Sequence, residues 1–91
     1  MLESKHQKKI IDFLVKQGWY CVKIISCSKP GFPDLIAYRN GLDIYIETKN
    51  ENGKLAPLQI FVHKQLKGNS KIVIVPYGFD DFKSKYIELN F

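Results

Sequence analysis

The chain has 91 residues, of which 45% are hydrophobic and 25% are charged. This length and composition are those of one globular domain, residues 1–91, and they exclude a disordered protein. Lys and Arg number 14 against 9 Asp and Glu, so the net charge of +5 favours a polyanionic partner such as nucleic acid, although a solvated basic surface explains it equally well.

Apolar periodicity predicts a first helix from about Leu2 to Gln17, which a glycine ends. Ile10 and Leu14 form its apolar face, and Gln7 lies beside them. Glu3 falls on the same face, where a charge is out of place. This position therefore invites a functional explanation.

Three strands are predicted to follow the first helix. Residues 19–25 are rich in aromatic and β-branched side chains, and residues 26–33 form a loop with two prolines and a glycine. Strands are then predicted over Asp34–Arg39 and Leu42–Lys49. Asn40-Gly41 between them is typical of a type I′ hairpin turn.

A second helix is predicted from Pro57 to about Lys67, because proline suits the first helical position. The apolar run over residues 71–76 predicts a strand buried on both faces. In the tail, we expect a short helix from Asp80 to Lys85 and an extended segment from Tyr86 to Leu89. The order α-β-β-β-α-β predicts an α/β fold with a mixed sheet and helices packed on it.

The hairpin turn fixes which residues of the two strands lie opposite each other. Arg39 pairs with Leu42, and counting back along both strands places Asp34 opposite Glu47. Directly opposed residues have Cβ atoms about 5 Å apart. Lys49 projects from the same face, roughly 6.8 Å further along the strand.

Two opposed carboxylates repel each other, and a divalent cation between them would reverse that effect. Mg²⁺ is held by one or two carboxylates together with waters and phosphates, and the Thr48 carbonyl is placed to add a ligand. A lysine beside such a cation can orient or deprotonate water, or stabilise charge on a phosphate. The alternative is an ordinary surface salt bridge of Lys49 with Glu47 or Asp34, and a register slip would separate the carboxylates.

Three motifs in order resemble the VRR-NUC family of the PD-(D/E)XK nuclease superfamily. They are Gly31-Phe32-Pro33-Asp34-Leu35-Ile36, Glu47-Thr48-Lys49 and Pro57-Leu58-Gln59. With the helical Glu3, the resemblance spans about Glu3 to Val75. It implies a restriction-endonuclease-like α-β-β-β-α-β core, with a mixed central sheet flanked by helices.

The resemblance also implies roles for individual residues. Asp34 and Glu47 would bind Mg²⁺ or Mn²⁺ with the Thr48 carbonyl, and Lys49 would be the catalytic lysine. Glu3 would approach the metal directly or through water. The alternative for Glu3 is a first-turn carboxylate that complements the helix dipole.

Further residues are candidates for contact with DNA. Gln59 would face the site and contact DNA or a metal-bound water, or would instead satisfy backbone groups at the helix start. The other expected DNA contacts are Lys29, Gly31, Lys54 and Lys64, with solvated lysines as the alternative. We expect His6 and His63 to be half-buried or surface residues without a catalytic role. Tyr38 and Tyr45 are expected in the core.

The expected compartment is a microbial or virus-infected cytoplasm. Cys21 and Cys27 fit no zinc-ligand spacing, and we expect them to be packing residues in a reducing interior. No apolar run approaches the roughly 18 residues of a membrane helix. The N-terminus has no secretory signal, so no membrane partner is expected.

These observations together predict a metal-dependent endodeoxyribonuclease. The resemblance to stand-alone family members implies a homodimer that cuts branched DNA such as Holliday junctions. So small a chain leaves little room for sequence-reading parts, so we expect recognition of DNA shape. The alternatives are a less selective nickase or flap nuclease, and a non-catalytic nucleic-acid-binding module. The candidates for a dimer surface are the tail aromatics Phe79, Phe82, Tyr86 and Phe91.

Overall fold

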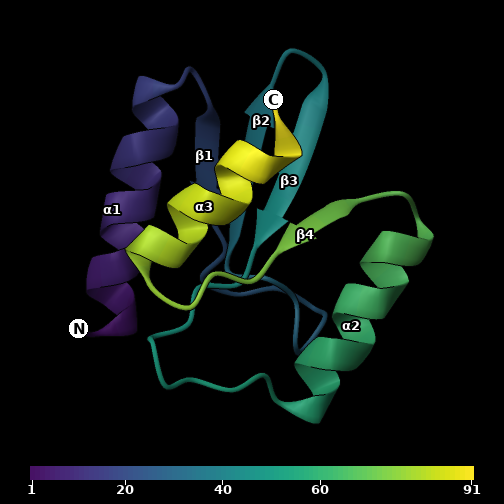
Figure 1. The fold of residues 1–91 in the computed structure, drawn as a ribbon. Helices are drawn as coiled ribbons and strands as arrows, with labels where there is room; N and C mark the ends of the chain where they lie inside the picture. Colours follow the sequence, from purple (N-terminus) through teal and green to yellow (C-terminus); the bar gives the residue numbers. More distant parts are fainter.

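The computed structural model describes residues 1–91 as a small α/β fold. Its four strands form one mixed open sheet in the order β1-β2-β3-β4 (Figure 1). β1 and β2 are antiparallel, as are β2 and β3, whereas β3 and β4 are parallel. Their bounds are β1 Tyr20–Lys23, β2 Leu35–Arg39, β3 Leu42–Ile46 and β4 Ile72–Ile74. The predicted order of elements is confirmed.

Three helices accompany the sheet. Their bounds are α1 Glu3–Lys16, α2 Pro57–Gly68 and α3 Phe79–Leu89. α1 and α3 pack together over the sheet, whereas α2 lies apart from them, beside β4 (Figure 1). α2 connects β3 to the parallel strand β4, as a crossover helix must. None of the three helices has the length and apolar character needed to cross a membrane.

The β2–β3 hairpin has the predicted turn and the predicted register. Asn40 and Gly41 have φ values of 50° and 80°, the left-handed conformation that a type I′ turn requires at both positions. Arg39 is paired with Leu42, and the pairing continues without a slip to Leu35 and Ile46. The two ends of the hairpin that carry the candidate carboxylates are therefore held in fixed relation.

The main core lies between one face of the sheet and the helices α1 and α3. Its buried side chains are Ile10, Leu14, Trp19, Leu35, Ala37, Ile44, Ile46, Ile74, Phe82 and Tyr86. Within it, the Trp19 indole Nε1 donates a buried hydrogen bond of 2.9 Å to the Tyr86 hydroxyl. This bond ties the start of β1 to α3.

The tail differs from the sequence expectation. The segment expected to be extended after Lys85 is instead the last part of α3, which runs to Leu89. Phe82 and Tyr86 are buried, and the Phe91 ring lies 5.1 Å from that of Trp19. Long-range packing on the core decides the conformation of this segment. Phe82 and Tyr86 are therefore core residues, and the suggestion that they form a dimer surface is wrong. Phe79 and Phe91 are partly buried against the core, and their place in a dimer surface stays a prediction.

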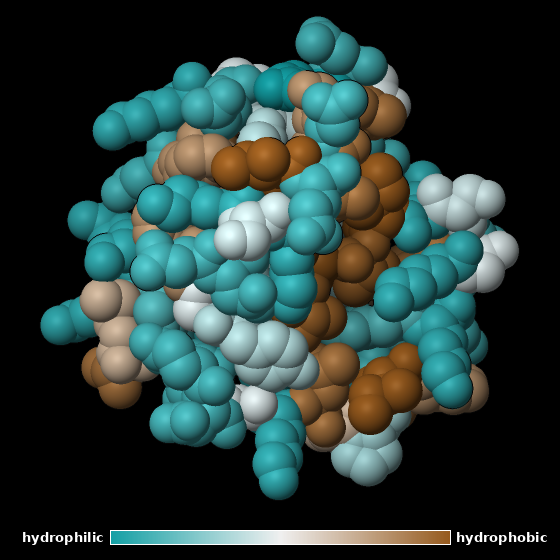
Figure 2. Space-filling view, viewed as in Figure 1, coloured by the Kyte–Doolittle hydropathy of each residue, from teal (hydrophilic) through white to brown (hydrophobic).

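Other burial expectations also need correction. β4 is an edge strand, so only Ile74 is fully buried and the strand is not covered on both faces. Tyr38 is 43% exposed and Cys27 is exposed, so neither is a core residue. On α2, the Phe61 side chain is 57% exposed, so this aromatic residue is not part of the core. Apolar side chains also reach the surface in a groove between β4 and α3 (Figure 2).

Candidate functional site

Asp34 and Glu47 lie at the open end of the β2–β3 hairpin. Asp34 immediately precedes β2, and Glu47 immediately follows β3. The Thr48 backbone N–H donates to Asp34 Oδ1 at 3.3 Å, so the two chain segments remain side by side beyond the last paired residues. The predicted juxtaposition of the two acidic residues is present.

The environment of this pair disfavours two negative charges. Burial raises the pKa of Glu47 to about 8, and the nearby negative charge of Asp34 adds to this effect. The pKa of Asp34 is also raised, chiefly by burial. Hydrogen bonds from the Thr48 backbone and the Glu47 carboxyl lower this pKa but do not cancel the effect of burial. At neutral pH and without a cation, the pair holds a proton on Glu47, which donates it toward Asp34.

Lys49 contributes the positive charge of the site. Its backbone is fixed, because its N–H donates to the Pro76 carbonyl at 3.1 Å and its own carbonyl accepts from Gly78 at 3.0 Å. The Lys49 ammonium partly opposes the rise in the pKa of Glu47 that burial causes, and it adds to the lowering of the pKa of His63 that is due first to burial. Lys49 therefore lies close enough to act electrostatically on the same buried site.

α1 adds two polar residues to the site. The Glu3 side chain is exposed in the first helical turn, and its charge raises the pKa of both Asp34 and Glu47. Gln7, one turn further along, is buried, and its hydrogen bond lowers the pKa of Asp34. Gln7 was not among the predicted site residues. Its position on the same helical face as Glu3 was the signal that could have identified it.

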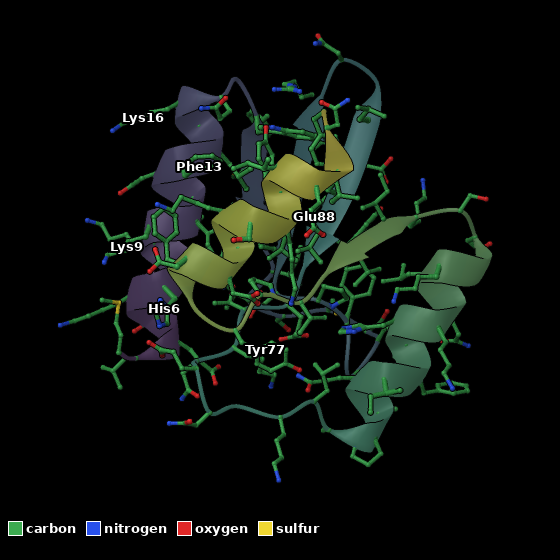
Figure 3. All side chains as sticks on the ribbon, viewed as in Figure 1. His6, Lys9, Phe13, Lys16, Tyr77 and Glu88 are labelled. Atoms are coloured by element: carbon green, nitrogen blue, oxygen red, sulfur yellow. The ribbon has the colours of Figure 1, made fainter.

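The two histidines are buried, contrary to the expectation of half-buried or surface positions. His6, at the N-terminal end of α1 (Figure 3), has both ring nitrogens engaged: Nδ1 accepts from the Phe79 N–H at 3.1 Å, and Nε2 lies 2.9 Å from Glu51 Oε1. His63 faces the acidic pair instead, with Nε2 at 3.6 Å from Glu47 Oε1. Neither His63 Nε2 nor Glu47 Oε1 has a hydrogen-bond partner, although both atoms are buried.

Gln59 lies at the start of α2. Its side-chain Oε1 accepts a 2.8 Å hydrogen bond from the Ala56 N–H. This contact satisfies a backbone group at the helix N-terminus, which is the alternative role stated for Gln59. A contact with DNA or with a metal-bound water stays a prediction.

The expected DNA-contacting lysines lie on the surface around these segments. Lys29 is in the loop before Asp34, Lys54 is in the loop after Lys49, and Lys64 is on α2. All three are exposed, and none forms a salt bridge within the chain. Their charges are therefore available to an anionic partner.

The donor atoms of the site fit a hard divalent cation in number and kind. No group of three or more His, Cys, Asp and Glu side chains is arranged to hold a metal ion. Asp34 and Glu47 nonetheless provide two carboxylates, and Glu47 Oε1 is buried without a partner. Mg²⁺ and Mn²⁺ sites need no more than one or two carboxylates, completed by backbone carbonyls, waters and substrate oxygens.

No protein-family model matches this chain, and no curated protein matches its sequence. Function is therefore inferred from the geometry and chemistry of the site.

The loop before Asp34 is held against α2 by Gly31. Gly31 has φ +84°, and a Cβ at this position would lie 2.9 Å from the Leu58 carbonyl oxygen. Both the backbone conformation and the close approach exclude a larger residue. This contact joins the segment carrying Asp34 to the first turn of α2.

Gly31→Ala should therefore destabilise the protein more than Gly41→Ala. Gly41 has a similar φ of +80°, but nothing lies within 4 Å of the added methyl group. The control should cost about 1 kcal/mol for the left-handed conformation, and Gly31→Ala about 1–3 kcal/mol more for the overlap. Urea unfolding of both variants measures the difference, and equal free energies of unfolding would contradict the role of the Leu58 contact.

Proposed function

We propose that this protein is a Mg²⁺- or Mn²⁺-dependent endonuclease that hydrolyses phosphodiester bonds in DNA. The observation that carries the proposal is the pair of half-buried Asp34 and buried Glu47 at the hairpin end, with the Lys49 charge acting on it. Such a pair is unfavourable without a cation and suited to one. The ordered motifs that resemble VRR-NUC nucleases support the same assignment, as does the α-β-β-β-α-β order of a restriction-endonuclease-like core.

Each residue has a role that follows from its surroundings. Asp34 and Glu47 would hold the cation with the Thr48 carbonyl, and Glu47 would release its proton on binding. The bound cation supplies Lewis-acid polarisation of the phosphate and a lowered pKa for a coordinated water. Lys49 would orient that water or stabilise the negative charge that develops on the phosphate. Glu3 lies at the edge of the site, where a water could link it to the cation.

Branched DNA such as a Holliday junction is the proposed substrate, and a homodimer is the proposed assembly. Both rest on the resemblance to stand-alone VRR-NUC nucleases. The net charge of +5 and the free surface lysines support binding to the DNA backbone. A less selective nickase or flap nuclease would use the same site on other DNA structures.

The test is cleavage of a four-way junction, a flap and a linear duplex in Mg²⁺, by the wild-type protein and by Asp34→Asn. We expect the wild type to cut the junction fastest and the variant to lose at least 10²-fold in rate, because one cation ligand is lost. Equal cutting of junction and linear duplex would exclude the junction-specific reading. Absence of cleavage of every substrate, with DNA binding retained, would favour the non-catalytic nucleic-acid-binding module.

A further inference from the structure

His63 of α2 is a buried polar side chain that the proposed mechanism does not use. It is 4% exposed, and its Nε2 faces Glu47 Oε1 at 3.6 Å. Resting on the proposed function, we propose that His63 is a positioning residue whose Nε2–H donates to Glu47 Oε1 and so directs the other carboxylate oxygen to the cation. The role acts through Glu47, and His63 itself touches neither cation nor substrate.

Three buried side-chain atoms have no hydrogen-bond partner, namely Glu47 Oε1, His63 Nε2 and Thr48 Oγ1, and the first two of them face each other. A buried polar atom without a hydrogen bond costs about 1–3 kcal/mol, and both Glu47 Oε1 and His63 Nε2 are in this condition. The two atoms are 3.6 Å apart, whereas the usual N···O distance of a hydrogen bond is about 2.9 Å. A small rotation of either side chain would close this gap. A carboxylate oxygen accepts hydrogen bonds and cannot donate them, so a donor such as the Nε2–H of His63 is the suitable partner for Glu47 Oε1.

The surroundings of His63 favour a neutral imidazole. Burial lowers the pKa of His63, and the charges of Lys67 and Lys49 lower it further. A neutral ring can donate from Nε2 without bringing a second positive charge next to the cation. Carboxylates that bind metals are commonly oriented by such an outer partner.

His6 shows what a purely structural buried histidine looks like in the same chain. Its Nδ1 accepts from the Phe79 N–H and its Nε2 contacts Glu51, so both ring nitrogens are engaged at rest. His63 Nε2 has no such partner and lies against a candidate cation ligand. This contrast separates His63 from a histidine that serves packing alone, and it supplies an internal control.

The first experiment measures Mn²⁺ binding to the full chain by titration calorimetry, in His63→Gln, His63→Leu and the wild type. Glutamine places an N–H donor near the position of Nε2, whereas leucine removes the donor and keeps an apolar side chain. We expect His63→Leu to weaken Mn²⁺ affinity by about 10–100-fold and His63→Gln to restore it to within about threefold. Equal affinities in all three proteins, or equal losses in both variants, would overturn the positioning role.

The second experiment follows the ring nitrogens of ¹⁵N-histidine-labelled protein during titration with Mg²⁺. We expect His63 Nε2 to keep its proton and shift, while the resonances of His6 stay in place. Loss of the Nε2 proton would mean that His63 binds the cation itself, which overturns the proposal. Asp34→Asn serves as the control for the site: if it abolishes cation binding while His63→Leu binds the cation as tightly as the wild type, the inference fails and the proposed function stands. If cation binding depends on His63 but no DNA is cleaved, the positioning role stands and the proposed nuclease function is contradicted.

Discussion

Replacing Lys49 by alanine should lower the single-turnover rate of DNA cleavage by about 10²–10⁴-fold. The substitution removes the positive charge that acts on Glu47 and that, in the proposed mechanism, would act on the reacting phosphate. The fold should persist, because the contacts of Lys49 that organise the chain are backbone hydrogen bonds to Pro76 and Gly78. The rate is measured on the best-cut DNA under saturating Mg²⁺, with the protein in excess.

Cation binding distinguishes the lysine from the carboxylates. Lys49→Ala should bind Mn²⁺ within about tenfold of the wild-type affinity, since a lysine is no ligand of a cation. Asp34→Asn should lose both cleavage and Mn²⁺ affinity. The surface variant Lys64→Ala serves as a matched loss of one positive charge, and we expect a rate within about tenfold of wild type. If Lys49→Ala cuts as fast as Lys64→Ala, Lys49 has no catalytic role.

The parts of the site that sequence reasoning located depend on local geometry. Asn40-Gly41 specifies the turn, because both positions need a positive φ that asparagine and glycine adopt readily. The turn sets the register, and the register places Asp34 beside Glu47–Thr48. Each step uses residues close in sequence, so no knowledge of the rest of the fold is required.

The parts that sequence reasoning missed depend on contacts between distant elements. His63 and Glu47 meet only because α2 returns to the sheet at one particular rotation, which helical periodicity does not fix. The C-terminal segment is helical to Leu89 because Phe82 and Tyr86 pack in the core, where Trp19 hydrogen bonds to Tyr86. Local β-propensity around Tyr86 is overridden by this packing. The burial of His63 beside Val62 on α2 likewise depends on how the helix packs on the rest of the fold.

The buried acidic pair should make the protein less stable as pH rises when no cation is bound. The folded state keeps the Glu47 proton up to about pH 8, whereas the ordinary pKa of a glutamate is 4.5. Between these values the folded state binds more protons than the unfolded state, so the free energy of unfolding falls as pH increases through this window. A group with a depressed pKa would produce the opposite slope.

Glu47→Gln should therefore be more stable than the wild type in chelator at pH 9, by about 2–4 kcal/mol. Glutamine keeps the shape of the side chain and removes the charge whose burial is unfavourable. At pH 4.5 the two proteins should differ much less, because Glu47 is protonated in the folded state and already half protonated in the unfolded state. Urea unfolding at the two pH values gives the comparison. A wild-type protein whose stability rises with pH would contradict the buried, protonated state of Glu47.

Mn²⁺ should reverse the order of the two proteins. A cation that binds only the folded state adds about 4.1 kcal/mol at a concentration one thousand times its dissociation constant, which matches or exceeds the advantage of about 2–4 kcal/mol expected for Glu47→Gln. The wild type should gain this stabilisation at pH 8 with release of the Glu47 proton, whereas Glu47→Gln should gain little, because a neutral amide is a poor replacement for a carboxylate ligand. Stabilisation of both proteins to the same extent would place the cation elsewhere. The same unfolding experiment therefore measures two quantities: the destabilisation that the acidic pair causes without a cation, and the stabilisation that a bound cation gives.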